Sequence, residues 1–195
     1  MLKKRIIPVL LINNNSLVKT VNFQNPRTVG DIISAVKVFD KRKADELLIL
    51  DIGNKYNHKM NISLVNEISK HCFVPLSFGG GIRSLSDAYK FFENGADKIV
   101  INTLFYKNKK LLDKIIKTFG SQAVIFSLDF TYNSQTKSYM CFSGNKIINQ
   151  DPINVAIQSE NMGVGEILFN DVDNDGLMQG YNIDFLNIIS NSVSI

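Results

Sequence analysis

The stretch VPLSFGGGIRSLSDAYKFFENGADKIVINT (residues 74–103) contains one complete repeat of the predicted fold. Apolar runs at 74–79 and 98–102 predict two short buried strands. Between them, Ser84 with Asp87 resembles a capping box that begins a helix, and Gly95 is typical of the residue that ends one. The stretch therefore predicts a strand, a helix and a second strand parallel to the first.

The same alternation of strand and helix continues along the chain. Asp31 precedes the amphipathic run IISAVKVF, and Gly120 ends the run KKLLDKIIKTF. Asp151-Pro152 is an N-cap followed by a proline in the first turn, and Gly163 ends that helix. Six such units in series predict a parallel sheet with right-handed crossovers. The predicted strands are 5–12, 46–51, 74–79, 98–102, 122–129 and 166–171.

Two connections are longer than the others, 13–30 after the first strand and 130–150 after the fifth. Within the second, 138–143 and 146–149 predict a hairpin around Gly144-Asn145. Because no low-complexity tract or charge block marks a boundary, we expect one domain.

Composition and charge exclude several classes of function. The 195 residues carry a formal net charge of +4, and the lysines are scattered, which argues against a nucleic-acid partner. The longest apolar stretch, 6–12, is too short to cross a bilayer, so no membrane partner is expected. Two cysteines are too few for a disulfide framework and indicate a reducing cytoplasm.

Polar residues follow the carboxyl ends of the predicted strands. Each alone is more often a helix cap or a turn residue, but these ends form one face of a barrel. Glycine lets backbone N–H groups approach an anion, and Asn-Thr adds side-chain donors, so a phosphate site is predicted. Asp129 is the best-placed candidate for proton transfer. The residues at these ends are Asp51, Gly79-Gly80-Gly81, Asn102-Thr103, Asp129 and Asp171.

Charged residues stand at the opposite ends of four strands. Each alone is most simply a solvated strand end. Two basic and two acidic groups in alternation, however, can close into a self-neutralising ring of salt bridges. The four are Arg5, Glu46, Lys98 and Glu166.

The sequence offers little for metal or nucleophile chemistry. His58 and His71 lack a partner at ligand spacing, and no CxxC or HExxH motif is present. We therefore expect no metal and no cofactor.

The chain resembles the cyclase subunit (HisF) of imidazole glycerol phosphate synthase, a (β/α)8 TIM-barrel family of histidine biosynthesis. The resemblance runs along the whole chain. The motifs that carry it are KRIIPVL, LVKTVNF, DELLILDI, FGGGI, GADKIVINT, FGSQAV, Ser143-Gly144 and GEILFNDVDNDGLMQGY.

The resemblance implies a role for each matching residue. Family members take ammonia from a glutaminase subunit docked at the amino-terminal face and use it on a phosphorylated ribulosyl nucleotide. Arg5, Glu46, Lys98 and Glu166 match the ammonia gate, Asp97 and Gln122 match the docking face, and Asp129 matches one of two catalytic aspartates. The matches to phosphate and substrate positions are Lys19, Asp51, Gly80, Gly81, Asn102, Thr103, Ser143, Gly144, Asp175 and Gly176.

One family residue is replaced. Leu11, in VLLINNN (residues 9–15), stands where the family has its other catalytic aspartate. The same change marks a paralogue branch that resembles ammonia-channelling partners in acetamidino-sugar biosynthesis of surface polysaccharides, where a further amidotransferase takes part. The resemblance thus leaves cyclase and ammonia conduit as alternatives.

Chain length provides a last expectation. The fold needs about 250 residues and eight units, whereas 1–195 supplies about six. We expect a single partial TIM barrel truncated at its carboxyl end, and an inactive fragment is a third alternative.

Overall fold

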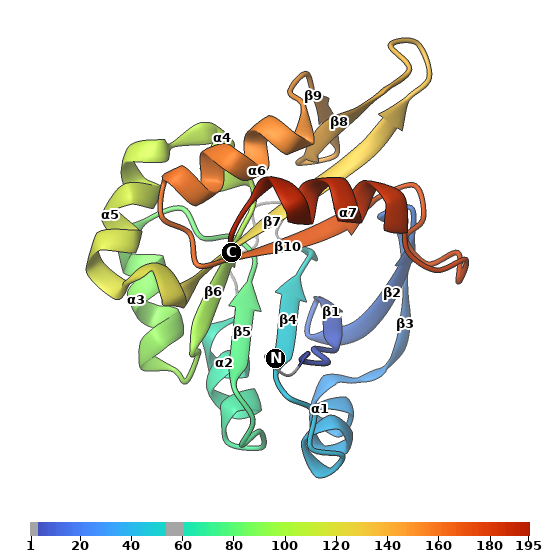
Figure 1. The fold of residues 1–195 in the computed structure, drawn as a ribbon. Helices are drawn as coiled ribbons and strands as arrows, with labels where there is room; N and C mark the ends of the chain where they lie inside the picture. Colours follow the sequence, from blue (N-terminus) through green and yellow to red (C-terminus); the bar gives the residue numbers. More distant parts are fainter. Residues whose placement is uncertain (1–3, 54–60) are drawn as a thin grey trace. The chain divides into compact units, whose positions relative to one another are not determined.

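The computed structural model describes residues 4–53 and 61–195, in which strands and helices alternate (Figure 1). The chain forms two compact units. The first comprises Met1–Lys19 with Pro26–Val100, and the second comprises Thr20–Asn25 with Ile101–Ile195. The prediction for His58 lies outside the described residues.

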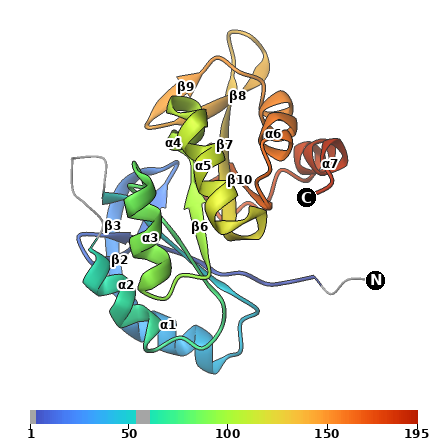
Figure 2. The same ribbon diagram turned by 90° about the vertical axis from the view of Figure 1, so that its left-hand side faces the viewer.

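The first unit is built on strands in the order β3-β2-β1-β4-β5-β6. β1, β4, β5 and β6 pair in parallel, as predicted, because helices connect them. Helices α1, α2 and α3 lie side by side along these strands (Figure 2). The bounds are β1 Val9–Asn13, β2 Ser16–Val21, β3 Gln24–Asp31, α1 Ile32–Lys41, β4 Leu47–Asp51, α2 Ile62–Ser69, β5 Leu76–Gly79, α3 Leu85–Glu93 and β6 Lys98–Ile101.

The helix-start signals are confirmed in atomic detail. The Asp31 carboxylate accepts from the Ser34 backbone N–H at 2.7 Å. The Ser84 hydroxyl accepts from the Asp87 N–H at 3.1 Å, and the Asp87 carboxylate accepts from the Arg83 N–H at 3.0 Å. Each contact satisfies an amide that has no partner within the helix.

The connection 13–30 differs from the expectation of a long loop, because most of it is strand. β1 and β2 pair antiparallel through the two-residue turn Asn14-Asn15, whose φ angles are 49° and 64°. Asparagine adopts this left-handed conformation more readily than most residues, which makes a tight hairpin turn. A second pair with positive φ, Asn22-Phe23, separates β2 from β3. The sheet is consequently mixed rather than all parallel.

The second unit centres on β7, which pairs in parallel with β10 and antiparallel with β8. The predicted hairpin is confirmed, since Ser143 pairs with Lys146 across Gly144-Asn145. α6 and α7 lie side by side (Figure 2). The bounds are α4 Thr103–Lys107, α5 Lys109–Phe119, the short 3₁₀ helix Ser121–Ala123, β7 Val124–Asn133, β8 Ser138–Ser143, β9 Lys146–Ile148, α6 Pro152–Asn161, β10 Glu166–Asp171 and α7 Ile183–Ser192.

Aromatic side chains fix this unit's core. Phe130 of β7 stacks on Phe169 of β10, with ring centroids 4.3 Å apart. Phe185 of α7 stacks on Tyr139 of β8 at 4.0 Å. These contacts hold α7 against the strands, so that the register between β7 and β10 is set by packing as well as by hydrogen bonds.

The observed architecture is a mixed α/β arrangement consistent with a TIM-barrel-like fold. The predicted six-unit partial barrel over 1–195 stays a prediction. Across the residues the structure describes, no helix is both long and apolar enough to cross a membrane.

The Ser84 cap gives a first test. Ser84→Ala removes the acceptor at the start of α3 and is expected to lower the free energy of unfolding by about 1 kcal/mol. Ser86→Ala, at the exposed second residue of the same helix, is the matched control and should leave the free energy of unfolding nearly unchanged. Urea unfolding followed by circular dichroism measures both; equal effects would contradict the capping assignment.

Candidate functional site

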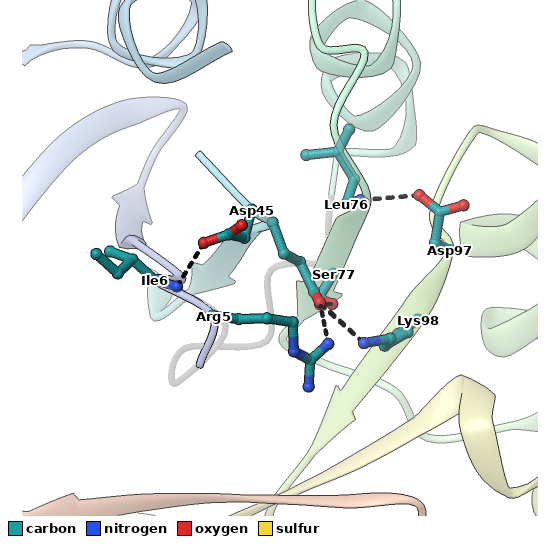
Figure 3. Close-up of polar contacts among 8 residues, drawn as sticks. Arg5, Ile6, Asp45, Leu76, Ser77, Asp97 and Lys98 are labelled. Atoms are coloured by element: carbon teal, nitrogen blue, oxygen red, sulfur yellow. Dashed lines mark hydrogen bonds and ion pairs between the residues drawn. The ribbon is translucent and has the colours of Figure 1, made fainter. Parts of the chain in front are cut away.

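A buried carboxylate lies before the amino end of β4. Glu46 is 2% exposed and accepts from Arg5 Nη1 at 3.1 Å and from Lys98 Nζ at 2.9 Å. The Ser77 hydroxyl donates to its other oxygen at 2.6 Å. Figure 3 shows Arg5, Lys98 and Ser77 converging from three separate segments. We call these four residues the Glu46 cluster.

Parallel pairing explains this convergence. Lys98 begins β6 and pairs with Ser77 of β5, so both lie at the strand starts beside Glu46. Arg5 is 48% exposed at its side chain, whereas Lys98 is 15% exposed. The structure thus brings together three of the four residues of the predicted ring, the cations Arg5 and Lys98 and the carboxylate of Glu46. The fourth, Glu166, begins β10 in the second unit, and its place in the ring stays a prediction.

The two predicted docking residues differ in their local roles. The Asp97 carboxylate accepts from the Leu76 N–H at 2.8 Å, and its own N–H donates to the Leu76 carbonyl at 2.8 Å. Asp97 therefore ties β6 to β5 next to the Glu46 cluster (Figure 3). Gln122 is exposed in the short helix Ser121–Ala123 of the second unit. Their docking role stays a prediction.

At the carboxyl ends of the first unit's strands, Asp51 and Gly80 are in contact. A Cβ on Gly80 would lie 2.5 Å from the Asp51 carbonyl oxygen, so this position requires glycine. Gly80 and Gly81 have φ of 122° and 69°, which bends the chain sharply after β5. The Asp51 carboxylate accepts from the Gly53 N–H at 2.8 Å.

Leu11 lies in the middle of β1, opposite Leu50 of β4 and Val18 of β2. Leu11 therefore occupies a strand position among apolar neighbours, and it provides no titratable group there. Lys19, which matches a substrate position of the family, is exposed on β2.

In the second unit, Asp129 forms the centre of a polar cluster in the middle of β7, which continues to Asn133 rather than ending at residue 129 as predicted. Its Oδ1 accepts from Ser127 Oγ at 2.9 Å and from Asn170 Nδ2 at 2.8 Å. Its Oδ2 accepts from Asn102 Nδ2 at 3.0 Å. We call Asp129, Ser127, Asn170 and Asn102 the Asp129 cluster.

Two hydroxyls adjoin this cluster. Ser143 donates to Asn102 Oδ1, and the Thr103 and Ser143 hydroxyls lie 3.3 Å apart. The structure thus brings Asn102, Thr103, Ser143 and Asp129 together, and their roles in catalysis and phosphate binding stay predictions. Gly144 follows Ser143 in the exposed hairpin turn, with φ of 58°.

The surroundings of Asp129 set its proton affinity. Burial raises the pKa of its carboxyl from 3.8 to about 6, against the opposing effect of the hydrogen bonds from Asn170 and Ser127. A carboxyl with this pKa exchanges protons near neutral pH, which suits a general acid or base.

Sequence reasoning missed Ser127 and Asn170. Ser127 lies two residues before Asp129 and so shares its face of β7. Asn170 is aligned with Asp129 in the parallel pair β7–β10. The sequence pointed instead to Asp171, whose carboxylate accepts from the Asp173 N–H and from Asn174 Nδ2 within the following turn. The period of two along β7 could have identified Ser127, whereas Asn170 needed the register.

Asp175 and Gly176 lie against residues 20–25, which belong to the same unit. The Asp175 carboxylate accepts from Thr20 Oγ1 at 2.8 Å and from the Phe23 N–H at 3.2 Å. Gly176 has φ of 74°, and a Cβ there would clash with the Thr20 carbonyl. These contacts give both residues a structural role, and their phosphate-binding role stays a prediction.

Within 4–53 and 61–195, no group of three or more His, Cys, Asp or Glu side chains could hold a metal ion. The Asp129 cluster itself presents a carboxyl among amide and hydroxyl groups.

The raised pKa of Asp129 predicts a pH-dependent stability. Below about pH 4 the carboxyl is protonated in both the folded and unfolded states, and between about 4 and 6 only the folded state holds the proton. Its contribution to stability is thus fully present at acid pH and is lost as the pH rises through 6. Asparagine at this position does not titrate. The free energy of unfolding of Asp129→Asn, taken relative to that of the wild type, should therefore rise by on the order of 2 kcal/mol between pH 4 and 7.5.

Urea unfolding of both proteins at the two pH values measures this difference. Asp113→Asn, at a half-exposed carboxylate paired with Lys117, is the control and should not gain stability in this way. A stability difference between Asp129→Asn and wild type that does not change with pH would contradict the raised pKa.

Comparison with known proteins identifies the family. The family described as "Histidine biosynthesis protein" matches residues 5–195. The chain is 34% identical over 195 residues to the putative imidazole glycerol phosphate synthase subunit hisF2 of Campylobacter jejuni, covering 100% of this chain and 78% of that protein. It is 37% identical over 189 residues to a putative HisF subunit of Leptospira interrogans, covering 95% of this chain and 74% of the relative.

A relative whose name does not include the word "putative" has a similar sequence identity. The imidazole glycerol phosphate synthase subunit HisF of a Hydrogenobaculum species is 36% identical over 197 residues, covering 100% of this chain and 78% of the relative. The resemblance seen in the sequence motifs is confirmed, and the chain belongs to the HisF family of imidazole glycerol phosphate synthase subunits.

Proposed function

We propose that the protein is a cyclase-type subunit that performs acid–base chemistry on a phosphorylated substrate, using ammonia from a glutaminase partner. The observation that carries the proposal is the Asp129 carboxyl, held by three donors and with its pKa raised to about 6. Ring closure with ammonia requires protons to be taken from nitrogen and given to leaving groups, and a carboxyl with this pKa serves both directions. Asn102, Thr103, Ser143 and Gly144 would bind a phosphate beside it.

The Glu46 cluster supports the supply of ammonia. Glu46 is buried, whereas the Arg5 side chain is about half exposed, so Arg5 can leave the cluster at lower cost than the other members. A small neutral molecule could then pass the ion pair without a charge having to be buried. In this proposal Glu166 completes the ring, and Asp97 and Gln122 contact the glutaminase.

Leu11 favours a second candidate function. A two-carboxylate mechanism lacks its partner on β1, because leucine neither gives nor takes a proton. A protein with a gate and an altered acid–base pair fits an ammonia conduit. The ammonia would then be used by a further amidotransferase, as in acetamidino-sugar biosynthesis. An inactive fragment, the third alternative, predicts neither cooperative unfolding nor stabilisation by a phosphorylated ligand.

A turnover assay separates these functions. With the phosphorylated ribulosyl nucleotide and ammonium salt, a cyclase should turn over, and Asp129→Asn should lower the rate at least about 100-fold. Asp113→Asn is the matched control and should retain the wild-type rate. Leu11→Asp should raise turnover by restoring a second carboxyl. Absence of wild-type turnover, with activity appearing in Leu11→Asp, would exclude the cyclase function and favour the conduit.

Partner binding can be tested independently of turnover. Gln122→Arg places a bulky charge on the predicted docking face and should weaken capture of the glutaminase from the same genome at least tenfold. Gln135→Arg, at an exposed site between β7 and β8, is the matched control and should bind normally. Equal binding of both variants, measured by surface plasmon resonance, would contradict the predicted docking face.

A further inference from the structure

The two carboxylate oxygens of Asp129 have different surroundings. Oδ1 accepts two hydrogen bonds, from Ser127 Oγ and from Asn170 Nδ2. Oδ2 accepts one, from Asn102 Nδ2. Since each oxygen has two lone-pair directions, Oδ1 is saturated. Oδ2 keeps one direction that no residue in the described part of the chain fills.

The network also fixes where the donor hydrogens point. Asn170 Nδ2 donates to Ser127 Oγ at 3.1 Å, so the single hydroxyl hydrogen of Ser127 is directed to Asp129. Asn102 is oriented in the same way. Its Oδ1 accepts from Ser143, and its Nδ2 therefore faces the Ser127 carbonyl and Asp129 Oδ2.

We propose that Ser127 and Asn170 are positioning residues that occupy Oδ1 of Asp129 and so make Oδ2 the oxygen that gains and releases the proton. The inference rests on the proposed acid–base function of Asp129. In the base direction, an Oδ2–H bond forms as the substrate N–H or O–H bond breaks, and the substrate atom keeps the electron pair. In the acid direction the same proton is returned.

The groups that face Asp129 from neighbouring elements keep the local charge constant during this titration. Burial raises the pKa of the Cys141 thiol of β8 to about 11, and it raises the pKa of the Tyr106 hydroxyl of α4 well above its usual value. Both are neutral where Asp129 titrates. The residues aligned with Asp129 on β8 and β10 are Phe142 and Asn170, which do not titrate.

The first experiment measures the Asp129 titration itself. Carbon-13 NMR of the aspartate carboxyls, with Asp129→Asn identifying the resonance, gives its pKa in the wild type, in Ser127→Ala and in Asn170→Ala. Each variant removes a donor to the anion and should raise this pKa by about one unit. Ser127→Thr keeps a hydroxyl and should return the value toward wild type.

Matched controls remove similar hydrogen bonds elsewhere in the unit. Ser159→Ala deletes a buried hydroxyl that donates to the Ala156 carbonyl, and Asn174→Ala deletes an amide that donates to Asp171 at 2.7 Å. Both should leave the Asp129 pKa unchanged. An unaltered pKa in both Ser127→Ala and Asn170→Ala would overturn the proposal.

The second experiment tests the assignment of the proton to Oδ2. In the turnover assay of Ser127→Ala and Asn170→Ala, the pKa read from the pH profile of kcat/KM should shift by the same amount as the Asp129 pKa measured by NMR. The plateau value of kcat should stay within about tenfold of the wild-type value. A shifted pKa with an unmoved pH profile would overturn the assignment. If the wild type does not turn over, the proposed function fails, while the NMR titration still decides whether Ser127 and Asn170 set the proton affinity of Asp129.

Discussion

Parallel pairing of β10 with β7 is the constraint on which the site of the second unit depends. The register places Asn170 opposite Asp129, and stacking of Phe130 on Phe169 in the same pair holds that register. A shift by one residue would turn Asn170 to the other face of the sheet. The amide would then be lost from Asp129, and Ser127 would lose the donor that orients its hydroxyl.

The Asp129 cluster balances two opposing effects on one carboxyl. Burial disfavours the anion, and the hydrogen bonds from Ser127 and Asn170 favour it. Burial alone would leave a neutral acid, and hydrogen bonding alone would leave a permanent anion. Their combination brings the pKa to about 6, and the unequal sharing of donors distinguishes the two oxygens chemically.

The Glu46 cluster follows a different principle. Glu46 is as buried as a core residue, and it is stabilised by two cations and a hydroxyl. A buried ion pair contributes little net stability, but removing one partner is costly, so such a cluster is specific in geometry. Arg5 is about half exposed and Glu46 is buried, so the cluster joins a surface cation to an interior carboxylate.

The sequence by itself determined the alternation of strand and helix, because apolar runs, caps such as Asp31 and Ser84, and glycine stops are local signals. It also singled out Asp129, Asn102 and Ser143 as polar residues beside apolar runs, although β7 continues past Asp129 to Asn133, and its motifs identified the family. It did not predict the hairpin at Asn14-Asn15, since two asparagines in left-handed conformation are a weaker signal than Asn-Gly.

Only the tertiary structure decided which polar groups touch. Ser127 and Asn170 lie 43 residues apart, and the register of two parallel strands, which no local pattern encodes, brings both to one carboxylate oxygen. The same holds for Arg5, Glu46 and Lys98, whose contacts depend on three strands starting at one edge. Burial, and with it the proton affinity of Asp129, is likewise a property of the folded chain, because it arises from what surrounds a side chain in space.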